Sequence, residues 1–103
     1  MRTRHRCFDA ASIKSEIIPY DFYLREQALD HFKSRSRGWV EAGLCPFHDD
    51  SSTGSFWIHL ESGAFKCFSC DSKGGDIIAF TMLKYDLPFY EALTQLANEW
   101  EVK

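Results

Sequence analysis

Two short motifs, each with two potential metal ligands, constrain the fold of this chain more than any other feature. The sequence reads "CPFH" from Cys45 to His48 and "CFSC" from Cys67 to Cys70, with 18 residues between the motifs. In each motif two residues separate the ligands, so a tight turn can direct both toward one ion. Three thiolates and one imidazole fill a tetrahedral shell, and soft sulfur ligands favour zinc. We therefore predict one structural zinc ion with no open position for a reacting water.

Other interpretations of the four cysteines stay open at this point. Disulfides would suit a secreted domain, but the basic start "MRTRHRCFDA" has no apolar segment behind it and is not a secretory signal. Buried structural cysteines beside an incidental histidine are a second alternative. A redox pair at Cys67 and Cys70 is a third, although no thioredoxin-like βαβ pattern surrounds it. Cys7 lacks matching spacing and is interpreted as a free thiol, and His31 as a surface residue on a helix.

The length of 103 residues suits one domain, which we place at residues 10–103 after a basic tail at residues 1–9. Hydrophobic residues make up 45% of the chain, enough for a modest core. No apolar run approaches the ~20 residues needed to span a bilayer. We therefore expect a soluble, intracellular protein and a monomer.

Charge is distributed unevenly along the sequence. Residues 1–40 hold eight Lys and Arg against five acids, whereas residues 41–103 hold four against ten. Such asymmetry suggests a side that faces a polyanion, although an ordinary solvated surface has the same composition.

The pattern of apolar and turn residues predicts an α+β fold, with a small antiparallel sheet flanked by helices. A hairpin is indicated by "SFWIHL" and "AFKCF" on either side of the turn "ESG". An extended segment, "WVEAGL", precedes it. Helices are predicted at 10–18, at 19–32, after Asp76 over 77–85 and after Pro88. The last of these has an apolar face at helical spacing, made of Phe89, Leu93, Leu96, Ala97 and Trp100.

Alternation along the hairpin predicts which side chains share a face of the sheet. Phe56, Ile58 and Leu60 belong to one face, and so do Phe65 and Cys67 of the second strand. The opposite, open face is expected to present Trp57, His59, Lys66 and Phe68. Aromatic platforms beside cations are how proteins hold single-stranded DNA. The alternative is that Trp57 and Phe68 are packed under a helix and that the lysines are simply solvated. Further candidates flank this face, namely Lys33, Arg35, Arg37, Trp39 and Lys73.

The segments "GLCPFHDD", "SF" and "FKCFSCDSKGGDIIAF" closely resemble the N-terminal zinc-binding domain of bacterial primases of the DnaG type. The similarity covers roughly residues 10–100. It implies a zinc-ribbon fold whose Cys-His-Cys-Cys ligands correspond to Cys45, His48, Cys67 and Cys70. It also implies contact with a single-stranded template and a part in choosing where a primer starts. The setting that the resemblance implies is the bacterial cytoplasm, for a protein of bacterial, plasmid or phage origin.

The chain departs from this family pattern in two places. The spacer reads "SSTGSF", without the usual lysine and proline, and Asp71 stands where glycine is common. The family's separate catalytic domain holds magnesium with paired acids, and no Asp-x-Asp pair occurs in this sequence. We therefore expect no nucleotide polymerisation by this chain alone. It is interpreted as an excised domain of a primase-like protein or as a free-standing homologue.

A protein-interaction module is the competing functional class. Zinc ribbons serve as docking surfaces, and the acidic second half of the chain suits a basic replication or transcription protein. Under the DNA-binding interpretation, the expected protein partners are a primase catalytic domain or a replicative helicase.

Overall fold

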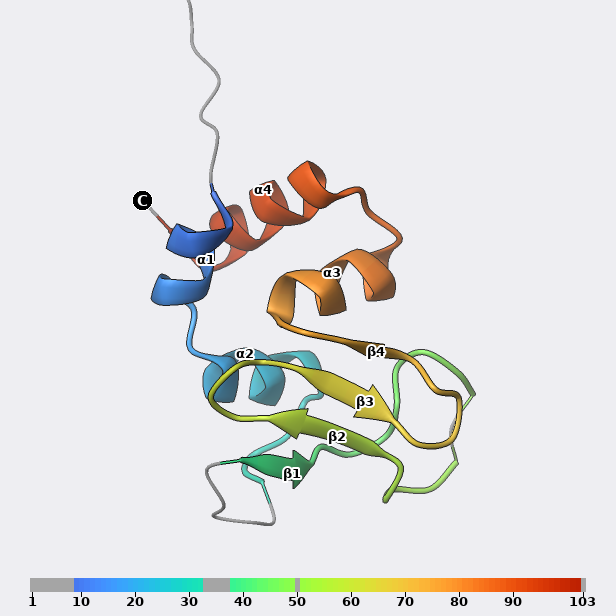
Figure 1. Cartoon of the computed structure of the whole chain (residues 1–103). Coiled ribbons are helices and arrows are strands. Elements are labelled where there is room, and N and C mark those ends of the chain that lie inside the picture. The colour runs from blue at the N-terminus through green and yellow to red at the C-terminus, as the bar shows by residue number, and fades with distance from the viewer. Residues whose placement is uncertain (1–8, 33–37, 50, 103) are drawn as a thin grey trace, which may run out of the picture.

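The computed structural model describes residues 9–32, 38–49 and 51–102. The elements follow in the order α1 (Ala10–Glu16), α2 (Pro19–Glu26), β1 (Trp39–Glu41), β2 (Phe56–His59), β3 (Phe65–Cys67), β4 (Lys73–Gly74), α3 (Ile77–Tyr85) and α4 (Phe89–Glu99). Figure 1 shows the sheet at one end of the molecule, with α1, α3 and α4 gathered at the other. The predicted α+β class is confirmed.

The four strands form one antiparallel sheet in chain order, β1-β2-β3-β4. Residues directly opposite each other in an antiparallel pair lie on the same face. Trp57 of β2 pairs with Lys66 of β3, which in turn pairs with Lys73 of β4. Along β2, buried Phe56 and Ile58 alternate with partly exposed Trp57 and His59. The predicted division of the hairpin into an inner and an open face is therefore confirmed.

Aromatic rings fill the space between the inner face of the sheet and the helices. Phe65 of β3 meets Phe80 of α3 edge to face at 5.5 Å between ring centroids, and Phe80 meets Tyr23 of α2 at 5.0 Å. The buried Tyr23 hydroxyl donates a 2.7 Å hydrogen bond to the Gly63 carbonyl in the β2–β3 turn. This bond satisfies the polar end of a buried ring and ties α2 to the hairpin.

Helix α2 is shorter than predicted, because it ends at Glu26 instead of continuing to residue 32. Ala28 adopts a left-handed φ of 54°, and the amide of Leu29 bonds back to the Leu24 carbonyl. This pattern is a Schellman motif, and it stops the helix. The side-chain amide of Gln27 then donates to the Ala42 and Leu44 carbonyls, and these bonds hold the end of α2 beside the segment that follows β1. His31 is exposed as predicted, but it lies beyond the helix.

Strand β4 was not among the predicted elements. The strand has only two residues, and one of them is Gly74. A Cβ at Gly74 would lie 2.5 Å from the Phe65 ring and 2.8 Å from the Ala79 Cβ. The glycine therefore lets β4 lie against a core aromatic ring.

The two C-terminal helices follow the prediction closely. Asp76 caps α3, since its carboxylate accepts from the Ala79 amide at 2.9 Å. On α4, Leu93, Leu96 and Ala97 are buried, but Phe89 is 39% exposed. The predicted placement of Phe89 on the apolar face is therefore wrong.

Some expectations concern residues that the structure does not describe, and one concerns membrane-spanning helices. Residues 33–37 and Cys7 lie outside the described residues, so the expected free thiol at Cys7 stays a prediction. No helix within residues 9–32, 38–49 and 51–102 has the length and apolar character to cross a membrane.

Candidate metal centre and nucleic-acid face

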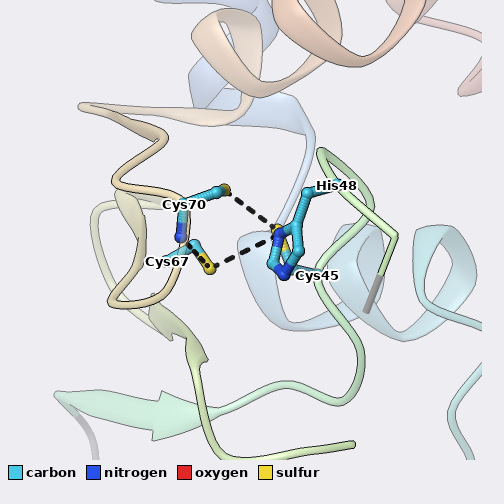
Figure 2. A group of neighbouring side chains, drawn as sticks. All are labelled: Cys45, His48, Cys67 and Cys70. Carbon is cyan, nitrogen blue, oxygen red and sulfur yellow. Dashed lines mark hydrogen bonds between the residues drawn. The ribbon is translucent and has the colours of Figure 1, made fainter. Parts of the chain in front are cut away.

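The two motifs meet in space, as their spacing predicts. One ligand atom from each of Cys45, His48, Cys67 and Cys70 lies within 4.8 Å of all the others. Figure 2 shows the four side chains converging from two separate turns. The Sγ atoms of Cys45 and Cys70 are 3.8 Å apart, and Cys67 Sγ is 4.0 Å from His48 Nδ1. Tetrahedral zinc would separate two sulfurs by about 3.8 Å and sulfur from nitrogen by about 3.6 Å.

The first ligand turn is fixed to the core by Phe47. Its ring contacts Phe65 and Phe80 at centroid distances of 5.4 and 5.3 Å, and Phe56 at 6.0 Å. The backbone amide of Phe47 also donates to Cys45 Sγ at 3.3 Å. Phe47, which lies between the ligands Cys45 and His48, therefore anchors their turn to the aromatic core.

The second ligand turn leaves β3 directly, because Cys67 is the last residue of that strand. The amides of Ser69 and Cys70 both lie 3.4 Å from Cys67 Sγ and donate to it. Hydrogen bonds from amides stabilise a negatively charged sulfur, so this turn is suited to a thiolate ligand.

Two of the thiols differ strongly in acidity. Burial raises the pKa of Cys45 to about 12, while the hydrogen bond with Ser72 lowers the pKa of Cys70 to about 6. Cys70 Sγ lies 3.3 Å from the Ser72 hydroxyl oxygen. A divalent cation favours the thiolate form of both side chains. The donor set, the spacing and the amide contacts thus fit a zinc ion.

A groove of about 750 Å³ lies on the open face of the sheet, on the side of β2 and β3 opposite the aromatic core. Phe68 is 70% exposed and Trp39 is 47% exposed. Most of the residues that line the groove are apolar, and two are lysines. The lining residues are Trp39, Trp57, Ala64, Phe65, Lys66, Phe68, Lys73 and Gly74.

The aromatic side chains of this face are positioned by neighbouring groups. Trp57 Nε1 donates to the Gly54 carbonyl at 3.0 Å. Trp39 meets His59 edge to face at 5.4 Å, across the β1–β2 pair. His59 Nδ1 accepts from the amides of Glu61 and Ser62, so this histidine also orders the hairpin turn.

The structure brings together most of the predicted nucleic-acid residues that it describes. Trp39, Trp57, Lys66, Phe68 and Lys73 line the groove, while His59 lies beside it against Trp39. The alternative that Trp57 and Phe68 are packed under a helix does not fit Phe68, whose ring is mostly exposed. Three further predicted residues lie outside the described residues, namely Lys33, Arg35 and Arg37.

Two carboxylates on or beside this face were not among the predicted site residues. Glu41 pairs directly with Trp57 across β1 and β2, and Asp71 forms an ion pair with Lys66. The signal for Glu41 was its position two residues after Trp39, which places both on one face of a strand. The hydrogen bond and charge of Lys66, with the charge of Lys73, hold the pKa of Asp71 below its usual value.

Comparison with known proteins assigns the chain to a family. Residues 26–103 match the family described as the CHC2 zinc finger, a zinc ribbon of the DnaG group. The chain belongs to the CHC2 zinc finger family. Its cofactor is accordingly one structural zinc ion, in agreement with the Cys-His-Cys-Cys cluster.

Relatives of this CHC2 zinc finger chain are DNA primases. It is 47% identical over 57 residues to the DNA primase of Streptomyces coelicolor, covering 55% of this chain and 9% of that protein. It is 37% identical over 73 residues to a DNA primase of Staphylococcus aureus, covering 71% of this chain and 12% of that protein. The chain thus spans about a tenth of the length of these curated relatives.

A solved structure supports the same assignment. The crystal structure of the Aquifex aeolicus primase, with its zinc binding and RNA polymerase domains, matches with a TM-score of 0.66 and 29% identity. The match covers 90% of this chain and 21% of the Aquifex chain. The resemblance to a primase zinc-binding domain is therefore confirmed at the level of both sequence and fold.

Proposed function

We propose that this chain is the zinc-binding, template-binding module of a primase-type system, and that it holds single-stranded DNA on the open face of its sheet. The observation that carries the proposal is the exposed aromatic groove, with Lys66 and Lys73 among the residues that line it. The groove lies on the same β3 strand that ends at the metal cluster. DNA primases among its relatives support the setting of replication priming.

In this proposal Cys45, His48, Cys67 and Cys70 are the four zinc ligands. Zinc bound there acts as a cross-link between the turn before β2 and the turn after β3, and a shell of four protein ligands leaves no coordination position for substrate. The side chains on the open face then perform the binding.

Aromatic rings and lysines have separate tasks on the open face. A base stacked on an aromatic side chain gains ~1–3 kcal/mol, regardless of its identity. Phe68 offers the most exposed ring of the groove, and Trp57 is held by its bond to Gly54. Lys66 and Lys73 pair across β3 and β4, which places two ammonium groups near the path of a phosphate backbone. Lys33, Arg35 and Arg37 precede β1 in the sequence and are proposed to extend this path.

Nucleotidyl transfer is assigned to a separate catalytic domain. The similarity is to the zinc-binding part of primases, which makes up a small fraction of those proteins. A polymerising centre needs clustered carboxylates. The one cluster of potential metal ligands found among the described residues is the Cys-His-Cys-Cys group.

Fluorescence anisotropy with a labelled oligothymidylate tests the proposal. We expect binding that weakens between 50 and 200 mM salt, because phosphate contacts release counterions. Phe68→Ala is expected to weaken binding by about 1–3 kcal/mol. Tyr90→Ala is the matched control, since Tyr90 is 72% exposed but lies on α4. Absence of binding in the zinc-loaded protein at 50 mM salt would refute the proposal.

A protein-docking function is the second candidate, and a separate surface favours it. Phe89 and Tyr90 are both exposed at the start of α4, beside the acidic Glu91. An aromatic patch next to a carboxylate suits a basic protein segment. A docking function explains the chain better if neither the wild type nor any variant binds DNA, and if Tyr90→Ala abolishes the binding of a replication protein that the wild type binds.

A further inference from the structure

Asp71 has an unusual place and conformation beside the groove. It follows directly after Cys70, and its amide donates to the Cys67 carbonyl at 2.9 Å. Its backbone φ is +67°, a left-handed conformation that glycine adopts readily and other residues adopt rarely. Asp and Asn tolerate this conformation better than most side chains. Asp71 therefore belongs to the second ligand turn, in a backbone conformation that is unfavourable for residues other than glycine.

The Asp71 carboxylate contacts the most enclosed cation of the groove. Lys66 Nζ donates to it in an ion pair, with the Asp71 side chain 79% exposed and the Lys66 side chain 25% exposed. The same ammonium group lies 5.7 Å from the centre of the Phe68 ring. Lys66 is thus the cation adjoining the proposed stacking platform, and a carboxylate already occupies one of its donor positions.

We propose that Asp71 is an intramolecular competitor of the DNA phosphate, so that a strand binding at Phe68 must displace this carboxylate from Lys66. The inference rests on the proposed single-strand binding function and describes how that same site is regulated. Displacement is feasible, because the Asp71 carboxylate is largely solvated and an ion pair with a solvated partner contributes little stability. The carboxylate nevertheless stays tethered close to the groove, where it repels an incoming phosphate.

Two consequences follow for binding. Removing one negative charge at about 4 Å from a bound phosphate raises the affinity for DNA roughly fivefold at low salt. The salt dependence also changes, since Lys66 paired with Asp71 has a protein carboxylate as its counterion and not a salt ion. While Asp71 stays close, Lys66 neutralises less of the phosphate charge. A freed Lys66 neutralises up to one more phosphate and releases its counterion, which steepens the slope of log K against log salt by up to about 0.7.

The test is an oligothymidylate titration at several salt concentrations with the zinc-loaded wild type and Asp71→Asn. Asparagine removes the charge and retains tolerance of the left-handed backbone. Asp71→Gly is the second variant, because it removes the charge and the backbone strain together. Asp86→Asn is the matched control, since Asp86 is exposed and left-handed at φ 54° but lies at the end of α3.

We expect both Asp71 variants to bind roughly fivefold more tightly at low salt with a steeper salt dependence, while Asp86→Asn matches the wild type. Equal affinity of wild type and Asp71→Asn would overturn the inference while leaving DNA binding intact. Weaker binding by both variants would overturn it too, because Asp71 would then position Lys66 for the phosphate. Failure of the wild type and every variant to bind would refute the proposed function itself.

Discussion

At the scale of single residues, the metal cluster depends on side chains with little freedom to move. Cys67 is fully buried, ends β3 and accepts from two amides. Phe47 fixes the opposite turn through its contacts with core rings. Both turns are therefore ordered partly by the fold, and zinc connects two positions that already lie close together.

Replacing Cys67 by serine is expected to abolish stoichiometric zinc binding and to lower the melting temperature by at least about 10 °C. A hydroxyl is a poor zinc ligand, and the site depends on all four donors. Zinc content and thermal unfolding are the measurements. Cys7→Ser is the control, because Cys7 is not among the proposed ligands. A Cys67→Ser protein with one zinc per chain and unchanged stability would contradict the ligand assignment.

Zinc binding is also expected to release protons at neutral pH. The pKa of Cys45 is raised to about 12 by burial, so this thiol is protonated before metal binds and must lose its proton to become a ligand. Zinc affinity should therefore fall as pH falls. Calorimetric titration of the metal-free protein in buffers with different ionisation enthalpies measures the protons released. A heat of binding independent of the buffer would contradict this expectation.

The four candidate ligands could be predicted from sequence, because each pair occupies a short turn with fixed spacing. The acids of the open face were harder to predict. Glu41 reaches Trp57 through the register of β1 against β2, and nothing in the sequence specifies that register. Asp71 reaches Lys66 because the turn after β3 folds back on the strand. Contacts of this kind depend on strand pairing, which local patterns do not determine.

At the scale of elements, the short strand β4 joins the sheet to α3. Gly74 of β4 packs against the ring of Phe65 in β3, and Asp76 caps α3 two residues after Gly74. Strand β4 escaped prediction because two residues give no periodicity, whereas α3 was predicted because its cap and apolar run are both local. The end of α2 escaped prediction for a similar reason, since Ala28 carries no signal for a left-handed C-terminal position.

Gly74→Ala is expected to destabilise the protein by about 1–3 kcal/mol, because a methyl group there overlaps the Phe65 ring. Gly75→Ala is the matched control, since a Cβ at Gly75 meets no atom within 4 Å. Urea denaturation followed by tryptophan fluorescence compares the two. Equal stability of both variants would show that β4 does not pack as described.

Asp76→Ala is expected to lower the free energy of unfolding by about 1 kcal/mol through loss of the α3 cap. Asp76→Asn retains a capping oxygen but loses the exposed ion pair with Lys14, which has a separation of 3.4 Å, so its effect should be small. Chemical denaturation of both variants separates the cap from the charge. A larger loss in Asp76→Asn than in Asp76→Ala would contradict this assignment.

At the scale of the whole molecule, one small sheet positions the core, the metal cluster and the proposed binding surface. Helices and aromatic rings cover the inner face of the sheet, the metal cluster lies at the end of β3, and the groove opens on the outer face. The class of fold and the two faces of the hairpin could be predicted from alternation and turn signals. The groove itself could not, because its walls come from all four strands.

The central claim is that single-stranded DNA lies on the open face of the sheet, and photo-crosslinking tests it most directly. The measurement uses zinc-loaded protein and an oligonucleotide containing 5-iododeoxyuridine, which crosslinks to aromatic side chains stacked on it. Mass spectrometry then identifies the residue attached to the base. We predict attachment at Phe68, Trp57 or Trp39. Attachment at Phe89 or Tyr90 of α4, or no crosslink in a complex that binds DNA, would contradict the account.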